Sequence, residues 1–141
     1  MSRSAAREVA MMMVYAGLMG GSETPKDIDA MLERVPPLDE EGRAFAEEIA
    51  EGVKEHAEEL DALIGEHSHE WALSRIGRVD LAILRVAVYE ILYRDDVPTG
   101  AAINEAVELS KMYCGEKSSA FVNGILGGIV RDRQEEPAED G

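Results

Sequence analysis

The sequence predicts an all-α protein in which about seven helices form a bundle of two small subdomains that share one core. Three observations predict this class. Apolar residues recur at spacings of three and four along the chain, no stretch rich in Val, Ile and Thr alternates as a β-strand does, and Gly, Pro and capping residues divide the pattern into segments. A chain of 141 residues has room for one stable core without disulfides or a structural metal.

Three helices are predicted in the first half of the chain. The first spans Ser4–Met19, with Ser4 as its N-cap, and a Gly-Gly pair ends it. The second spans Thr24–Arg34, begins with a Thr-Pro step and ends before two prolines. The third spans Asp39–Gly65. Asp39 caps this helix, apolar residues at helical spacing line one face, and acidic residues fill the opposite face.

Four more helices are predicted in the second half, at Glu70–Ile76, Val79–Tyr93, Ala101–Tyr113 and Ser118–Arg131. Apolar residues cover so much of the circumference of the second of these helices that we expect it to lie at the centre of the bundle. Thr99 is expected to cap the third helix, and Ser118 the fourth, after a loop at Cys114–Lys117.

These helices indicate a single domain over residues 1–133, with subdomains at about 1–65 and 66–133. The sequence shows no internal repeat. Residues 134–141 are rich in Glu and Pro, and we expect this acidic tail to be disordered.

The apolar and cysteine content predicts a soluble cytoplasmic protein. The longest apolar stretch, Val9–Gly21, is shorter than the roughly 20 residues that cross a bilayer. It follows two arginines, as in a secretory signal, but Glu8 stands at its edge and no cleavage pattern follows. The single cysteine, Cys114, has no partner for an intrachain disulfide, which indicates a reducing compartment.

The sequence offers little for catalysis. His67 and His69 would diverge by about 200° on a helix, so they cannot bind one metal ion together there. Cys114 has no base beside it, and no glycine-rich phosphate loop is present. Gly124 and Gly128 lie one turn apart, which favours close helix packing. We therefore expect a binding module without catalytic residues, metal or cofactor.

Two places could bind a ligand on a chain whose formal charge is −15. Arg3 and Arg7 lie four residues apart at the start of the first helix, with Tyr15 further along. They form either a small anion site or two solvated arginines. The segment Gly115–Ser119 is either a second anion site or a simple helix cap.

Several motifs resemble the signature of the NusB family of transcription antitermination factors. They are Val79–Leu92 followed by Val97-Pro98, Ala102–Lys111, Phe121–Leu126, Ala6-Arg7-Glu8 with Tyr15, and Trp71 before the central helix. They occur in the family's order and at matching spacing over most of the chain. Such coverage is not expected by chance.

The resemblance implies an all-α fold of two helical subdomains and a non-enzymatic role in bacterial transcription. Members of the family pair with NusE, a small-subunit ribosomal protein, and the pair binds the single-stranded boxA element of nascent RNA, notably in ribosomal RNA leaders. With other Nus factors on RNA polymerase, this complex suppresses termination.

The resemblance also implies site residues. Asp80 matches the acid that contacts NusE. The residues expected at the RNA are Arg3, Arg7, Tyr15, Lys117, Ser118, Ser119 and Phe121, and Lys111 joins them as a neighbouring cation. Cations of this kind hold phosphates, and aromatic rings stack on bases. Phe121 is equally suited to the core, because its neighbours Val122 and Ile125 are apolar.

An alternative function is a protein-interaction or dimerisation module in which a second copy of the chain covers the basic surface. Sizing chromatography with and without NusE and a boxA oligonucleotide separates the two hypotheses, because only the first predicts a ternary complex.

Overall fold

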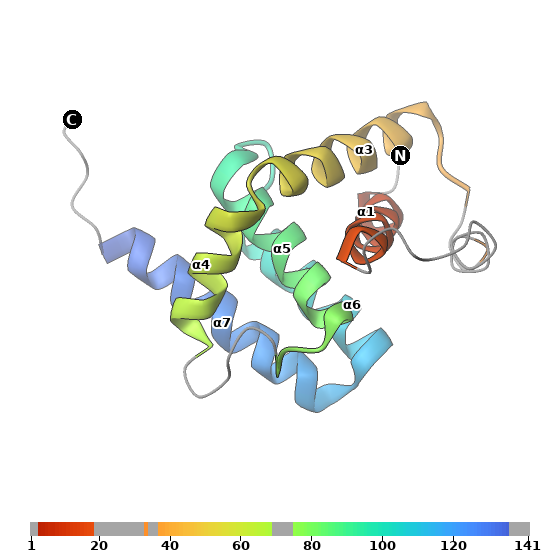
Figure 1. Cartoon of the computed structure of the whole chain (residues 1–141). Coiled ribbons are helices and arrows are strands. Elements are labelled where there is room, and N and C mark those ends of the chain that lie inside the picture. Colours follow the sequence, from red (N-terminus) through yellow and green to blue (C-terminus); the bar gives the residue numbers. More distant parts are fainter. Residues whose placement is uncertain (1–2, 19–32, 34–36, 69–74, 136–141) are drawn as a thin grey trace, which may run out of the picture.

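The computed structural model describes residues 3–18, 33, 37–68 and 75–135 (Figure 1). All regular elements in these ranges are helices, which confirms the all-α class. They are α1 (Arg3–Leu18), α3 (Glu40–Glu55), α4 (Ala57–His67), α5 (Arg78–Tyr93), α6 (Thr99–Cys114) and α7 (Glu116–Glu135). The predicted helices Thr24–Arg34 and Glu70–Ile76 lie largely outside the described residues, as does most of the predicted tail. None of the described helices is long and apolar enough to cross a membrane.

Helix α5 lies at the centre of the bundle, as its apolar circumference predicts. It contacts α1, α3, α4, α6 and α7, while α1 also packs on α3 and α6 on α7 (Figure 1). Leu84 and Val88 of α5 are fully buried. One continuous hydrophobic core receives side chains from all six described helices, for example Met11, Ile49, Leu60, Leu84, Ala106 and Leu126. The division into two subdomains stays a prediction.

The predicted helix Asp39–Gly65 is two helices. Asp39 is the N-cap of the first, as expected, and its carboxylate accepts a hydrogen bond of 2.7 Å from the amide of Gly42. The chain then breaks at His56, whose backbone leaves the helical region, and the ring of His56 stacks on Tyr93 with centroids 4.3 Å apart. The second helix continues past Gly65 to His67, so the prediction that Gly65 ends it is wrong.

A single glycine, rather than a loop, joins α6 to α7. Gly115 has φ of +102°, a conformation that glycine adopts at little cost, and its amide donates to the carbonyls of Ser110 and Lys111. Helix α7 therefore begins at Glu116, and the predicted loop Cys114–Lys117 is wrong. The three predicted caps Ser4, Thr99 and Ser118 also lie inside helices rather than at N-cap positions.

Helices α3 and α5 approach each other closely at Gly52, which is buried against Tyr89. A Cβ at Gly52 would overlap the ring of Tyr89, whereas a Cβ at Gly65 would meet no atom within 4 Å. Glycine is therefore required at Gly52 and merely tolerated at Gly65, although both lie within helices.

We expect Gly52→Ala to lower the free energy of unfolding by about 1–3 kcal/mol, because the added methyl group overpacks the contact with Tyr89. The matched control, Gly65→Ala, should raise it by about 0.5–1 kcal/mol, because alanine favours the helix. Urea unfolding measures both. Equal effects of the two substitutions would contradict the close packing of α3 on α5.

His67 joins α4 to α7 through Nε2, and its other ring nitrogen has a partner within α4. Nδ1 lies 3.0 Å from the carbonyl of Leu63, and Nε2 lies 2.7 Å from the carboxylate of Asp132. Gly128 leaves room for the ring, since a Cβ there would lie 2.9 Å from Cδ2 of His67. Burial lowers the pKa of His67, but the bonds to Leu63 and Asp132 outweigh it and leave the pKa above 6.5.

The contact of His67 therefore stabilises the fold below about pH 6.5, and this stabilisation is lost as the pH rises through the raised pKa of the folded state. We expect His67→Gln to lose less stability than the native chain between about pH 6 and pH 8 in urea unfolding. His56→Gln is the matched control and should retain the contribution of His67. If the stability of the His67→Gln variant depended on pH as strongly as that of the native chain, the role of this contact would be contradicted.

Candidate nucleic-acid interface

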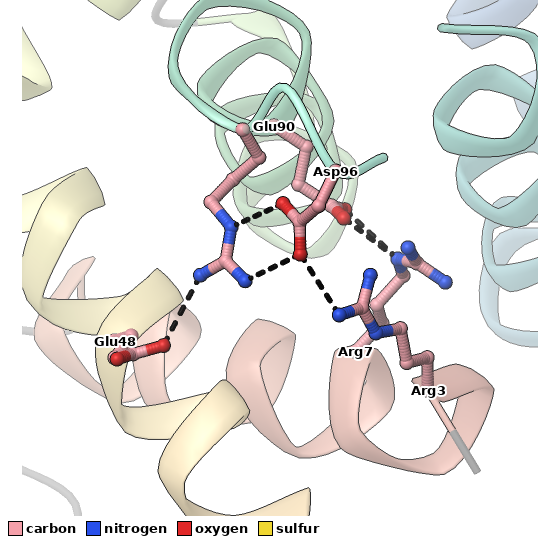
Figure 2. Close-up of polar contacts among 6 residues, drawn as sticks. Arg3, Arg7, Glu48, Glu90 and Asp96 are labelled. Atoms are coloured by element: carbon pink, nitrogen blue, oxygen red, sulfur yellow. Dashed lines mark hydrogen bonds and ion pairs between the residues drawn. The ribbon is translucent and has the colours of Figure 1, made fainter. Parts of the chain in front are cut away.

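The structure separates the two arginines at the amino end of α1 (Figure 2). The side chain of Arg3 is 35% exposed, but that of Arg7 is only 7% exposed. Arg7 faces the central helix α5, whereas Arg3 lies at the edge of the bundle. Both alternatives that the sequence left open, an anion site and solvated arginines, require an exposed Arg7, and Arg7 is buried.

Arg7 is buried in an ion pair with a carboxylate inside the fold. Its Nε donates to both carboxylate oxygens of Glu90 at 2.9 Å, and Nη1 lies 3.5 Å from Glu105. Glu90 is 1% exposed, and burial raises the pKa of this carboxyl while Arg7 opposes the rise. Arg7 thus neutralises a buried acid, and its guanidinium is not presented to a ligand.

Arg3 also has a carboxylate partner, but at the surface. Its Nη2 lies 2.8 Å from Oδ2 of Asp96, which follows α5 in the chain (Figure 2). Arg94 binds the same carboxylate through Nε and Nη2, at 2.9 and 3.0 Å. Hydrogen bonds from Arg94 and Arg3 hold the pKa of Asp96 well below its usual range. Arg3 and Arg94 both lie over the ring of Phe45, 4.6 and 5.0 Å from its centroid.

Tyr15 lies further along α1, half-buried against the hydrophobic core. Earlier on the same helix, the carboxylate of Glu8 accepts a hydrogen bond from the hydroxyl of Tyr113 and so connects α1 to the end of α6. Tyr15 is therefore held by packing, with part of its surface open to solvent.

A cleft of about 520 Å³ lies where the start of α5 meets the corner between α6 and α7. It brings together four of the predicted site residues, Asp80, Lys117, Ser118 and Phe121, with Arg75 beside them. Lys117 and Arg75 are exposed, and Phe121 is half-buried, packing against the core from the cleft wall. The cleft thus combines two cations, a hydroxyl and an aromatic ring.

Two further predicted residues lie near this cleft without lining it. Lys111 is exposed in the last turn of α6. Ser119 is buried, and its hydroxyl donates to the carbonyl of Glu116 at 2.8 Å. The hydroxyl of Ser119 therefore bonds back to the backbone of its own helix instead of facing a ligand.

Asp80, which the resemblance matches to the acid that contacts NusE, is buried in the first turn of α5. It is 6% exposed, and its Oδ1 accepts a hydrogen bond of 2.8 Å from the hydroxyl of Ser110. The reason is that α5 is central, so even its first turn is covered by α6. Burial, together with Asp80, raises the pKa of the Cys114 thiol to about 11, so this thiol is protonated near neutral pH.

The predicted RNA surface falls into two parts at opposite ends of α6 (Figure 1). Asp96, the partner of Arg3, precedes α6, and the cleft includes Cys114, its last residue. A helix of 16 residues is about 24 Å long. The arginine edge, formed by Arg3 and its partner Asp96, therefore lies about one length of α6 away from the cleft.

Arg75 is the cleft residue that sequence reasoning missed. A signal was present, because Arg75-Ile76-Gly77-Arg78 places two cations around a glycine directly before the central helix. Its position in the cleft depends on the return of α6 to the start of α5, which periodicity alone does not show.

Comparisons with known proteins point to one family. The model of the NusB family matches residues 4–131. The transcription antitermination protein NusB of Acetivibrio thermocellus is 46% identical, over 93% of this chain and 90% of its own. The protein of the same name from Geobacter sulfurreducens is 41% identical, over 92% of this chain and 94% of its own.

Solved structures agree. NusB of T. maritima has a TM-score of 0.78 and 30% identity, and the match covers 94% of this chain and 92% of that one. A chain from the crystal structure of the antitermination factors NusB and NusE in complex with dsRNA has a TM-score of 0.77 and 27% identity, covering 92% of this chain and 96% of that one.

We expect Arg7→Ala to lower the free energy of unfolding by about 3–5 kcal/mol, because it leaves the buried carboxylate of Glu90 without its partner. Arg3→Ala, one turn away, is the matched control and should have a much smaller effect, since its ion pair is exposed. Chemical unfolding followed by circular dichroism measures both.

The double variant Arg7→Met/Glu90→Met should be less destabilised than Arg7→Ala, because it removes both buried charges. Native stability of the Arg7→Ala variant would contradict the structural role of the pair.

Proposed function

Because this chain belongs to the NusB family, whose curated relatives are transcription antitermination proteins, we propose that it binds boxA-type single-stranded RNA together with NusE on RNA polymerase elongation complexes. The observation that carries this proposal is the similarity, over most of both chains, to a structure of NusB and NusE with RNA. That complex holds double-stranded RNA, so the preference for a single strand rests on the chemistry of the site.

We assign the principal RNA contact to the cleft. Arg75 and Lys117 can pair with phosphates, and Phe121 offers an aromatic face at the cleft wall. A base can reach such a ring only when it is unstacked, which favours single-stranded RNA. Ser118 supplies a hydroxyl to the same ligand, and Lys111 adds positive charge nearby.

The arginine edge provides the second contact. Arg3 remains accessible in part there, and so does Tyr15 about 18 Å further along α1, whereas Arg7 takes no part because it is paired with Glu90. RNA that reached both parts would run along α6, over about 24 Å.

The proposed role of NusE is to strengthen the binding of RNA to the cleft and the arginine edge. The chain carries a formal charge of −15, so it repels RNA at long range, and a partner with its own positive surface offsets this repulsion. We place NusE at the start of α5, where Asp80 contributes from within the cleft by holding Ser110 in position.

We further propose that the protein acts in the cytoplasm and is not an enzyme. Its role is that of an adaptor between RNA, NusE, other Nus factors and RNA polymerase. The protonated thiol of Cys114 in the cleft is in keeping with binding rather than nucleophilic chemistry.

Replacing the cleft cations should weaken boxA binding and reduce its salt dependence. Each of Lys117→Ala and Arg75→Ala should make the slope of log affinity against log salt shallower by about 0.7, the value for one phosphate of a single strand. Lys54→Ala, an equal charge change on the exposed face of α3, is the matched control and should leave the slope unchanged. Fluorescence titration of labelled boxA RNA measures the slope.

The same titration tests the partner. NusE should tighten RNA binding by about 5–150-fold, and RNA should tighten NusE binding by the same factor. Tight boxA binding by the chain alone, unchanged on adding NusE, would refute the partner-dependent proposal. A dimer in sizing chromatography that binds neither RNA nor NusE would favour the dimerisation module instead.

A further inference from the structure

Arg3, the partly exposed arginine of α1, is paired with a carboxylate of the same chain. Nη2 of Arg3 lies 2.8 Å from Oδ2 of Asp96, and both side chains remain partly exposed, at 35% and 47%. A guanidinium binds a carboxylate and a phosphate through the same N–H donors. Asp96 therefore occupies Nη2 of Arg3, one of the nitrogens that could bind an RNA phosphate.

Asp96 is held in place independently of Arg3. Arg94 grips both of its carboxylate oxygens, and Glu48 in turn accepts a hydrogen bond of 3.1 Å from Nη1 of Arg94 (Figure 2). If Arg3 turned away, the charge of Asp96 would still be balanced by Arg94. The contact can therefore open without leaving an unpaired acid behind.

Arg3 is held in position for such an exchange. Its guanidinium lies 4.6 Å from the centroid of the Phe45 ring, which supports it from the side of α3. Exposed ion pairs contribute little to stability, so a phosphate can displace the carboxylate at small cost. The ion pair between Arg3 and Asp96 is thus weak enough for a phosphate to displace the carboxylate. The carboxylate nevertheless lies where it competes with that phosphate for Arg3.

We propose that Asp96 is an internal competitor of RNA phosphate for Arg3, and that it limits the affinity of the arginine edge for RNA. This inference rests on the proposed function, because it requires that Arg3 contacts RNA. RNA binding at this edge is then an exchange in which one phosphate replaces one carboxylate. The carboxylate stays behind, paired with Arg94.

The test compares neutral replacements of two adjacent acids in the complex with NusE. Asp96→Asn should raise the affinity for labelled boxA RNA by about two- to fivefold, the range that corresponds to one exposed ion pair. Asp95→Asn removes the same charge next to it, but Asp95 takes no part in the ion pairs described for Arg3 and Arg94, so this substitution should give a smaller gain. The difference between the two variants isolates the competition from the general loss of negative charge.

A double variant shows whether the gain passes through Arg3. Arg3→Ala should lower the affinity, and Arg3→Ala/Asp96→Asn should gain no more over Arg3→Ala than Asp95→Asn gains over the native chain. A merely structural role of Asp96 would not produce this dependence. Asp96→Ser repeats the test with a smaller neutral side chain, and circular dichroism verifies that each variant is folded.

Two results would overturn the inference alone, namely equal gains from Asp96→Asn and Asp95→Asn, or a gain from Asp96→Asn that persists without Arg3. Unchanged RNA affinity in Arg3→Ala would overturn the inference and also remove Arg3 from the proposed function. The contribution of the cleft is judged separately, by Lys117→Ala.

Discussion

The ion pair between Arg7 and Glu90 joins the first helix to the central one, across 83 positions of sequence. Both groups are buried, so neither can lose its partner without a large cost in stability. The pair therefore fixes the register of α1 against α5. Arg3 lies one turn earlier on the same face of α1, and it reaches the edge of the bundle because α1 begins there.

The same register places Arg3 beside the connection between α5 and α6. Asp96 in that connection meets Arg3 on one side and Arg94 on the other, over the ring of Phe45 from α3. Three helices thus meet at one small group of charges. The proposed RNA contact of Arg3 is therefore one helical turn from the ion pair that stabilises the core.

The sequence predicts the elements of this fold better than the places where they join. Helical spacing identifies α5 as central, and Asp39 identifies the start of α3, because periodicity and capping are local properties. The break at His56 carries no Gly or Pro and depends on packing against Tyr93. The burial of Arg7 and Asp80 was not predicted, because their partners Glu90 and Ser110 lie 83 and 30 residues away.

The candidate site shows why so acidic a chain suits a partner-dependent role. A surface rich in free cations would bind any RNA through its phosphates, with little selection. Here Arg7 pairs with Glu90 and Arg3 pairs with Asp96. The cations Arg75 and Lys117 line the same cleft as the carboxylate of Asp80. Two of the candidate cations are thus paired with carboxylates of the same chain, so phosphate attraction alone gives little affinity. In the proposed function, base stacking and a second protein supply the remainder, so that selection comes from unstacked bases and from the partner rather than from charge.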